Sequence, residues 1–315
     1  MSSFKMLGGH GCKQRGRAGR CAGLVVATAL FLGPIASQAT EITAADGFRA
    51  ASDLVAEVRL LHDANYTTPP GNKLLRKQTV YPRHVLQLAR TVLRKANTLA
   101  WISGGETVLL GPMPTQMVRP SDVLEKLEAT DWVIQGLKPI FGVAVEIAPA
   151  PLDASKTPND VYAALYRLSQ MIDGLGIPKT VPNDIYQLAD AIVFELAIIR
   201  DHYGAPKVPL QPRDRGKDLR DVYGRVFVLA DTLGQLAAAR PELAPVGGVI
   251  RPSRRRGVTY ALNDILADVV EMRATTGRLD QAERGQVVSG MTPSHVYQRL
   301  DAALAIIRAL AEKNA

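Results

Sequence analysis

The sequence predicts an all-α protein with about eight amphipathic helices, arranged either as two packed four-helix bundles or as one irregular helical array. One observation is that an acidic residue or His followed by an aliphatic residue recurs eight times. The pairs are Asp53-Leu54, His84-Val85, Asp122-Val123, Asp160-Val161, Asp184-Ile185, Asp221-Val222, Asp264-Ile265 and His295-Val296. A second observation is that each pair opens a stretch whose apolar residues recur every three or four positions, the spacing of one helix face. No comparable stretch alternates strictly between apolar and polar residues, so strands are not expected.

The helical spacing is clearest in the fourth and eighth stretches. Apolar residues step by 4, 3, 4 and 3 positions from Val161 to Leu175, and by the same steps from Val296 to Leu310. We expect helices of roughly 16 to 22 residues, a length typical of packed bundles. The eight starts are separated by 24 to 43 residues, which is too uneven for a solenoid with a fixed repeat length.

A short phrase marks two of the predicted helix starts. "TPNDVY" runs from Thr157 to Tyr162, and "TPSHVY" runs from Thr292 to Tyr297. In the first phrase, Thr is a favourable N-cap, Pro suits the first helical position, and Asp160 at the third position completes a capping box. His295 occupies the same place in the second phrase, so the carboxylate is not required there. We therefore interpret the repeated acidic residue as a helix-start signal and not as a catalytic group.

Residues 1–39 have the features of a cleaved secretory signal peptide. A basic, acid-free start is followed by an apolar run from Cys21 to Ala36 and then by the small-residue ending "SQA". That run is shorter than a bilayer-spanning helix and is interrupted by Pro34. We predict a mature chain that starts at Thr40, has no transmembrane anchor after cleavage, and is located in the periplasm.

Charge and cysteine content narrow the possible partners. The whole chain has a net charge of +8 from 38 basic and 30 acidic residues. Five of the basic residues and none of the acidic ones lie in the predicted signal peptide, so the mature chain would carry +3, and nucleic-acid binding is not expected. Cys12 and Cys21 also lie in that segment, so the mature chain can form no disulfide and no thiolate metal site. An exported chain without cysteine fits a bacterial periplasm.

Composition suggests a domain boundary after residue 204. The stretch "GAPKVPLQPRDRGKDLR", from Gly204 to Arg220, concentrates Pro and charged residues. We predict an N-terminal helical bundle over residues 40–204 and a C-terminal helical region over 205–315, with a single continuous domain as the alternative. The oligomeric state is not predicted.

The connections between helices are long and share one composition. Stretches such as "ETVLLGPMPTQMVRPSD" and "VAVEIAPAPLDASKTPND" combine aliphatic residues with Pro before the next helix. We expect extended, fairly stiff segments that lie over the helices and are anchored by their aliphatic side chains. Loops of this kind commonly carry function.

Tyr follows the aliphatic residue of the repeated pair at four positions: Tyr162, Tyr186, Tyr223 and Tyr297. Aromatic residues make up only 5% of the chain, so this enrichment is unusual. One interpretation is that each ring packs beneath the incoming loop and bonds to its backbone through the hydroxyl. The other is that the four rings line a ligand groove, and we therefore include them among the candidate ligand-binding residues.

Basic residues concentrate in three connections, which would lead into helix N-termini that already attract anions. One contains Lys73, Arg76, Lys77 and Arg83, a second contains Lys207, Arg213, Arg215, Lys217 and Arg220, and a third contains Arg251, Arg254, Arg255 and Arg256. Arg213, Arg215, Lys217, Arg254, Arg255 and Arg256 are the basic candidate ligand-binding residues. The alternative is a solvated surface balanced by acidic residues on the helices.

Motifs for catalysis, metal binding and cofactors are missing from the sequence. There is no Gly-x-Ser-x-Gly and no phosphate-binding loop, and the four histidines of the mature chain fall on four different predicted helices. Glu57, Glu195 and Glu271 lie inside predicted helices, but nothing marks any one of them as a general acid. We therefore assign no catalytic residue, no metal ligand and no cofactor.

These observations favour an exported, non-catalytic binding or scaffolding protein. Its partner would be an envelope protein or an anionic envelope ligand, held by the basic loops at helix N-termini. The alternative is a small-molecule sensor or an enzyme with a pocket between helix bundles, lined by the four repeated Tyr residues.

Overall fold

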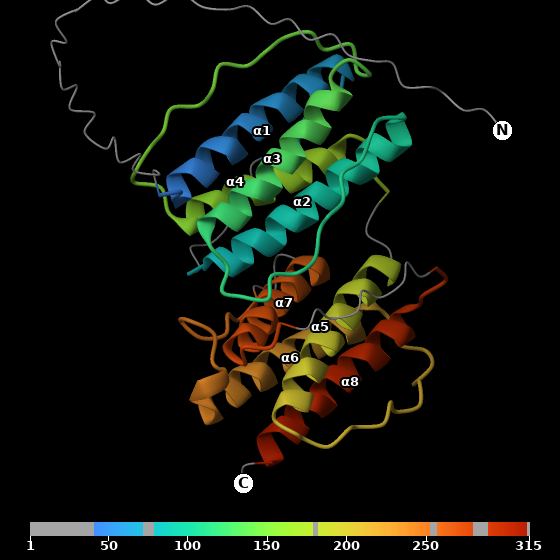
Figure 1. Cartoon of the computed structure of the whole chain (residues 1–315). Coiled ribbons are helices and arrows are strands. Elements are labelled where there is room, and N and C mark those ends of the chain that lie inside the picture. The colour runs from blue at the N-terminus through green and yellow to red at the C-terminus, as the bar shows by residue number, and fades with distance from the viewer. Residues whose placement is uncertain (1–40, 72–78, 179–181, 253–256, 280–288, 314–315) are drawn as a thin grey trace, which may run out of the picture. The chain divides into compact units, whose positions relative to one another are not determined.

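The computed structural model describes residues 41–71, 79–178, 182–252, 257–279 and 289–313. These residues form eight α-helices, one short 3-10 helix and no strand, so the predicted all-α class is confirmed (Figure 1). The helices are α1 (Ala44–Ala64), α2 (Pro82–Ser103), α3 (Pro120–Leu137), α4 (Pro158–Gly174), α5 (Pro182–His202), α6 (Leu219–Ala239), α7 (Val258–Thr275) and α8 (Pro293–Glu312), with the 3-10 helix η1 (Pro241–Leu243) between α6 and α7. In the part of the chain that the structure describes, no helix is long and apolar enough to cross a bilayer.

The predicted capping box is present at the start of α4. The Asp160 carboxylate accepts a hydrogen bond from the Thr157 backbone N–H at 2.9 Å and from the Thr157 hydroxyl at 2.7 Å. These bonds hold the pKa of Asp160 below its usual value. The same backbone bond recurs at α1, where Thr43 donates to Asp46 over 2.9 Å. The repeated acidic residue therefore satisfies an amide that the helix leaves unpaired.

Histidine performs the same capping role at two helix starts. The Tyr81 N–H donates to His84 Nδ1 over 3.2 Å at the start of α2, and the Thr292 N–H donates to His295 Nδ1 over 3.1 Å at the start of α8. An imidazole nitrogen thus replaces the carboxylate oxygen as the acceptor.

Two of the eight predicted helix starts are wrong. Asp53 lies well inside α1, whose capping residue is Asp46, and Asp264 lies well inside α7. Helix α7 begins after Gly257, which has a φ of 85°, and its first turn contains no acidic residue. Both pairs match the sequence pattern, but Ala50 and Ala261 stand three positions earlier, where a capping box needs its N-cap residue.

The helices pack as two groups of four (Figure 1). One hydrophobic cluster is built from α1 to α4, and another from α5 to α8. The predicted boundary at residue 204 placed α5 with the first group, but its apolar face, from Ile185 to Ile199, packs in the second cluster. The change of cluster therefore falls between α4 and α5.

Within each group, the first two helices do not contact each other, and neither do the last two, in the part of the chain that the structure describes. Helices α1 and α2 each contact α3 and α4, while α5 and α6 each contact α7 and α8. Helices α1 and α2 thus lie diagonally opposite each other, as do α5 and α6, unlike the consecutive neighbours in a bundle with short loops, whereas α2 still packs against α3 and α6 against α7.

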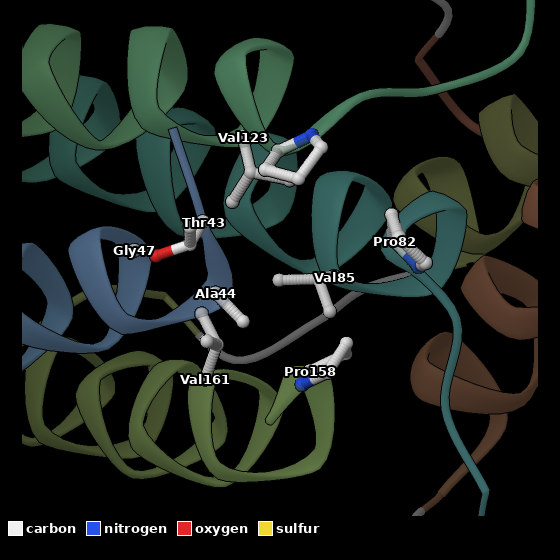
Figure 2. Close-up of a pocket in the computed structure, with 9 residues that line it drawn as sticks. Thr43, Ala44, Gly47, Pro82, Val85, Val123, Pro158 and Val161 are labelled. Atoms are coloured by element: carbon white, nitrogen blue, oxygen red, sulfur yellow. The ribbon is translucent and has the colours of Figure 1, made fainter. Parts of the chain in front are cut away.

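All four helices of the first group run in the same direction. The first-turn residues of α1, α2, α3 and α4 surround one small hollow (Figure 2). Farther along, Lys95 of α2 donates to Asp173 of α4 over 2.6 Å, and both residues lie about four turns from their helix starts. The connections of 16 to 20 residues in this group can reach about 50 Å when extended, enough to return along helices about 30 Å long.

The second group runs antiparallel to the first. Only seven residues separate α4 from α5, and they span at most about 25 Å, so α5 starts near the end of α4. At the contact between the groups, Tyr162 in the first turns of α4 bonds Asp264 of α7 over 2.9 Å. Ser169, farther along α4, lies 3.0 Å from the hydroxyl of Tyr260 at the start of α7. Helices α4 and α7 therefore point in opposite directions.

Long connections lie over the helices, as the sequence predicts. Asn97 of α2 bonds both the N–H and the carbonyl of Val108, at 2.9 and 2.8 Å. The Arg90 guanidinium donates to three successive carbonyls, those of Leu110, Gly111 and Pro112. Side chains of α2 thus satisfy the backbone of a connection that has no secondary structure of its own.

Candidate functional site

A buried arginine joins the two groups of helices. Arg83, in the first turn of α2, is only 1% exposed. Its Nε donates to Asp268 Oδ1 over 2.7 Å, and its Nη1 donates to Glu271 Oε2 over 3.1 Å. The same guanidinium donates to the carbonyls of Val246 and Gly248, each at 2.8 Å. Arg83 therefore belongs to the interior, and its prediction as part of a basic surface loop is wrong.

The neighbouring His84 completes this cluster, which we call the junction: Arg83, His84, Asp268 and Glu271. Because His84 Nδ1 accepts from Tyr81, Nε2 carries the proton and donates to Asp268 Oδ1 over 2.9 Å. The other Asp268 oxygen accepts from the Ile250 N–H at 2.9 Å. Both oxygens of Asp268 are thus engaged, and the geometry is that of a structural tie between helices.

The four predicted tyrosines have different surroundings. Tyr162 is buried and bonds Asp264, whereas the Tyr186 hydroxyl accepts from Arg299 Nε at 3.0 Å. Tyr223 stacks edge-on against Phe227 with ring centroids 5.0 Å apart. Tyr297 lies beneath two cations, with Lys217 Nζ and the guanidinium carbon of Arg225 each 4.9 Å from the ring centroid.

The structure does not gather these rings around one cavity in the residues that it describes. Tyr162 reaches α7, Tyr186 and Tyr297 contact basic side chains, and Tyr223 contacts its own helix. The hydroxyls of Tyr162 and Tyr186 bond side chains of neighbouring helices, so the expected bond to a loop backbone is wrong for both.

The basic residues singled out from the sequence lie in three different settings. Lys73, Arg76, Lys77, Arg254, Arg255 and Arg256 lie outside the described residues. Arg251 is exposed and pairs with Asp231 over 2.9 Å. Arg213, Arg215, Lys217 and Arg220 lie together in sequence around the start of α6, and we call this surface the basic end.

The connection that leads into α6 is held against the start of α8. The Lys217 N–H donates to Ser294 Oγ over 3.1 Å, and Gln298 Nε2 donates to the Gln211 carbonyl over 2.7 Å. The Arg213 guanidinium contacts His295 Nε2. These contacts place the basic end over the N-termini of α6 and α8, where helix dipoles add further positive potential.

Electrostatics keep this end cationic. A hydrogen bond with Asp214, 2.8 Å from Lys217 Nζ, raises the pKa of Lys217, so it stays charged at neutral pH. Partial burial and the nearby Arg213 charge lower the pKa of His295, so the imidazole is neutral there. Arg215 and Arg220 are exposed and form no ion pair with any carboxylate that the structure describes.

All three glutamates that the sequence places inside helices are buried and paired. Glu57 lies 2.9 Å from Lys138 Nζ, and Glu271 pairs with Arg83. Glu195 Oε2 lies 2.7 Å from Arg273 Nε, with both side chains almost completely buried. Burial raises the pKa of Glu195 to about 7, and the charge of Arg273 offsets only part of that effect. Each glutamate thus ties helices together.

A groove of about 420 Å³ lies between α1, α3 and the connection that follows α3. Ala50, Leu127, Ile147 and Pro149 supply its apolar lining, and Asp53, Glu57, Glu128, Asp131 and Glu146 supply carboxylates. We call it the acidic groove. Its residues were not predicted from the sequence, although Asp53 with Glu57 and Glu128 with Asp131 have the spacing of one helix face.

The small hollow at the start of the first group is a packing feature. Val85, Val123 and Val161, each at the fourth helical position, point into it (Figure 2). Helix α1 carries Gly47 at the equivalent position, so one side chain is missing from the ring. The hollow of about 20 Å³ has room for about one water molecule and no organic ligand.

Within the described ranges, no three His, Cys, Asp or Glu side chains are grouped closely enough to hold a metal ion. Comparisons of the chain with protein-family models, with curated proteins and with solved structures give no match. The junction, the basic end and the acidic groove are therefore the candidate functional features of the described residues.

Proposed function

We propose that this chain is an exported periplasmic protein that binds or scaffolds a partner without catalysis, through the basic end. The observation that supports this proposal most is the contrast among the predicted basic residues. Arg83 is buried and pairs with the carboxylates of Asp268 and Glu271. In contrast, Arg213, Arg215 and Arg220 are exposed. Exposed guanidinium groups can form bidentate hydrogen bonds with carboxylate or phosphate groups.

Helix geometry supports an anionic partner. The Met291 N–H, just before α8, donates to Asn183 Oδ1 in the first turn of α5 over 2.8 Å. The start of α5 therefore lies close to the start of α8. Three parallel helices therefore present their positive ends near the basic end. Asp218 and Asp221 cap the first turn of α6, and Asp214 pairs with Lys217. These three carboxylates against the four cations of the basic end leave one excess positive charge there.

The proposal is tested by salt-dependent capture. The chain from Thr40 onward, immobilised, is exposed to detergent-solubilised envelope extract at about 50 mM and about 500 mM NaCl. We expect a partner that is retained at low salt and released at high salt. The variant Arg213→Ala/Arg215→Ala/Arg220→Ala should lose that partner, because it removes three exposed cations without touching the core.

The matched control is Arg49→Ala/Arg59→Ala/Arg308→Ala, which removes three exposed cations elsewhere. Arg308 lies near the far end of α8, so it tests net charge against location. Equal loss of capture in both triple variants would show that only net charge matters. Capture that does not respond to salt or to the first triple variant would refute the proposal.

A further inference from the structure

The acidic groove lies on a face that the second helix group does not cover. Its walls come from α1, α3 and the connection after α3. Among the described elements, α1 contacts only α3 and α4, and α3 contacts only α1 and α2, whereas the second group meets α2 and α4 through α7. No described helix of the second group therefore contacts either helical wall of the groove.

The groove combines an acidic rim with an apolar lining. Lys138 is its only basic lining residue among those described, and it forms an ion pair with buried Glu57. Glu128 and Glu146 are exposed and form no ion pair with a described residue. The unbalanced charge at the rim is therefore negative, and a cationic segment with at least one apolar side chain complements it.

The chain itself contains a segment of that kind. Residues 206–216 are exposed at every described position except Val208 and include three prolines, at 206, 209 and 212. Lys207, Arg213 and Arg215 supply positive charge, and Leu210 is 53% exposed. Pro restricts the backbone before binding, so little conformational entropy is lost when such a segment docks.

We propose that residues 206–216 of one copy bind the acidic groove of a second copy. Leu210 lies on the apolar lining formed by Leu127 and Ile147, while Lys207 and Arg213 face the rim carboxylates. This inference rests on the proposed function, because it names the partner that the basic end engages. Groove and segment are different surfaces, so the contact is heterologous and extends into open chains unless its rotation closes a ring. The contact is small, so association is weak and salt-sensitive.

Sedimentation velocity tests this arrangement with two charge-reversal variants of the chain from Thr40 onward. The groove variant is Glu128→Lys/Glu146→Lys, and the segment variant is Arg213→Glu/Arg215→Glu; all four side chains are exposed, and circular dichroism checks that helicity is kept. Wild type is expected to form species larger than a dimer as concentration rises at low salt. Each variant alone should associate at least about tenfold more weakly, because like charges then face each other.

Mixing provides the decisive arm. In a heterologous contact, the groove variant keeps an unaltered segment and the segment variant keeps an unaltered groove. The mixture should therefore associate more strongly than either variant alone. Two reversed surfaces also attract each other, so the chain that carries all four substitutions should associate again at low salt. Arg59→Glu/Arg308→Glu is the control and should associate like wild type.

Three results overturn the inference: a monomeric wild type at all concentrations, a single variant that associates like wild type, or no association of the chain with all four substitutions. The proposed function fails separately. If wild type stays monomeric but Arg213→Ala/Arg215→Ala/Arg220→Ala still loses salt-sensitive capture, the partner is another molecule and the basic end remains the binding surface.

Discussion

His84 and His295 occupy the same position in two helix starts but lie in different surroundings. In each, Nδ1 accepts a hydrogen bond from the N–H of the N-cap residue. His84 Nε2 then faces Asp268 in the buried junction, whereas His295 Nε2 faces Arg213 at the basic end. One local pattern therefore fixes a helix start twice, and tertiary contacts decide whether that start joins helices or borders the exposed basic end.

The two helix starts differ in how their polar groups are used. The start of α2 is enclosed by α7 and its preceding connection, so its polar groups are used internally. The starts of α6 and α8 are covered by a single basic connection whose outer side chains reach solvent. The polar groups at the start of α2 are thus buried between the helix groups, whereas the cations at the starts of α6 and α8 stay accessible.

Removing the junction arginine should produce the largest effect. Arg83→Met leaves Asp268 and Glu271 buried without their cation, which we expect to lower the free energy of unfolding by about 3–5 kcal/mol. Arg251→Ala breaks an ion pair whose arginine side chain is 84% exposed, and we expect a change within about 0.5 kcal/mol. Urea unfolding measures both, and equal effects would contradict the structural role of the junction.

Replacing each of the two histidines with Asp should change the free energy of unfolding in opposite directions. His84→Asp removes the bond to Asp268 and adds a second buried carboxylate, so we expect destabilisation on the order of 3 kcal/mol. His295→Asp keeps an acceptor for the Thr292 N–H, suits the helix dipole and faces Arg213, so we expect stabilisation of about 0.3–1 kcal/mol. Equal changes in the unfolding midpoint would show that the local pattern alone determines the outcome.

The buried Glu195 predicts a pH dependence that belongs to the second group. Its pKa is raised from 4.5 to about 7, so the folded chain binds a proton that the unfolded chain releases between those values. Stability should therefore fall by up to about 3 kcal/mol as pH rises from about 4.5 to about 7, and this contribution should then level off. Urea unfolding across this range tests it, and Glu195→Gln should remove the slope; an unchanged slope in the variant would assign it to other groups.

Filling the small hollow of the first group should give a small stabilisation. Gly47→Ala adds a Cβ at ordinary contact distance, 3.6 Å from Val161 Cγ1, in a helix where Ala is preferred to Gly. We expect stabilisation of about 0.5–1 kcal/mol. Gly136→Ala, in α3 with open space around the added Cβ, is the matched control for helix propensity alone. A destabilised Gly47→Ala chain would contradict the packing explanation of the hollow.

The sequence predicts the elements of this fold better than their directions. Capping residues and apolar stripes act within a few positions, so most helices could be located, although Asp53 and Asp264 imitate helix starts inside helices. The shortest interval, 24 residues between Asp160 and Asp184, indicates where the helix direction reverses. A connection of seven residues is too short to return along α4, so the direction must reverse there.

The functional surfaces were only partly predictable because their partners are distant in sequence. Arg83 resembles its basic neighbours in the sequence, yet its carboxylate partner Asp268 lies 185 positions away. Arg213 and Lys217 could be selected because a Pro-rich, charged connection suggests exposure. The acidic groove required the knowledge that α1 packs beside α3, which no local pattern contains.

A hydrogen-exchange comparison of the free and partner-bound chain tests most directly whether the partner binds at the basic end and not at the junction. At low salt, with the salt-sensitive partner captured, we predict slower amide exchange across residues 206–221 and unchanged exchange around Arg83 and Asp268. High salt should abolish the difference. Slower exchange confined to other segments, with residues 206–221 unchanged, would contradict the assignment of binding to the basic end.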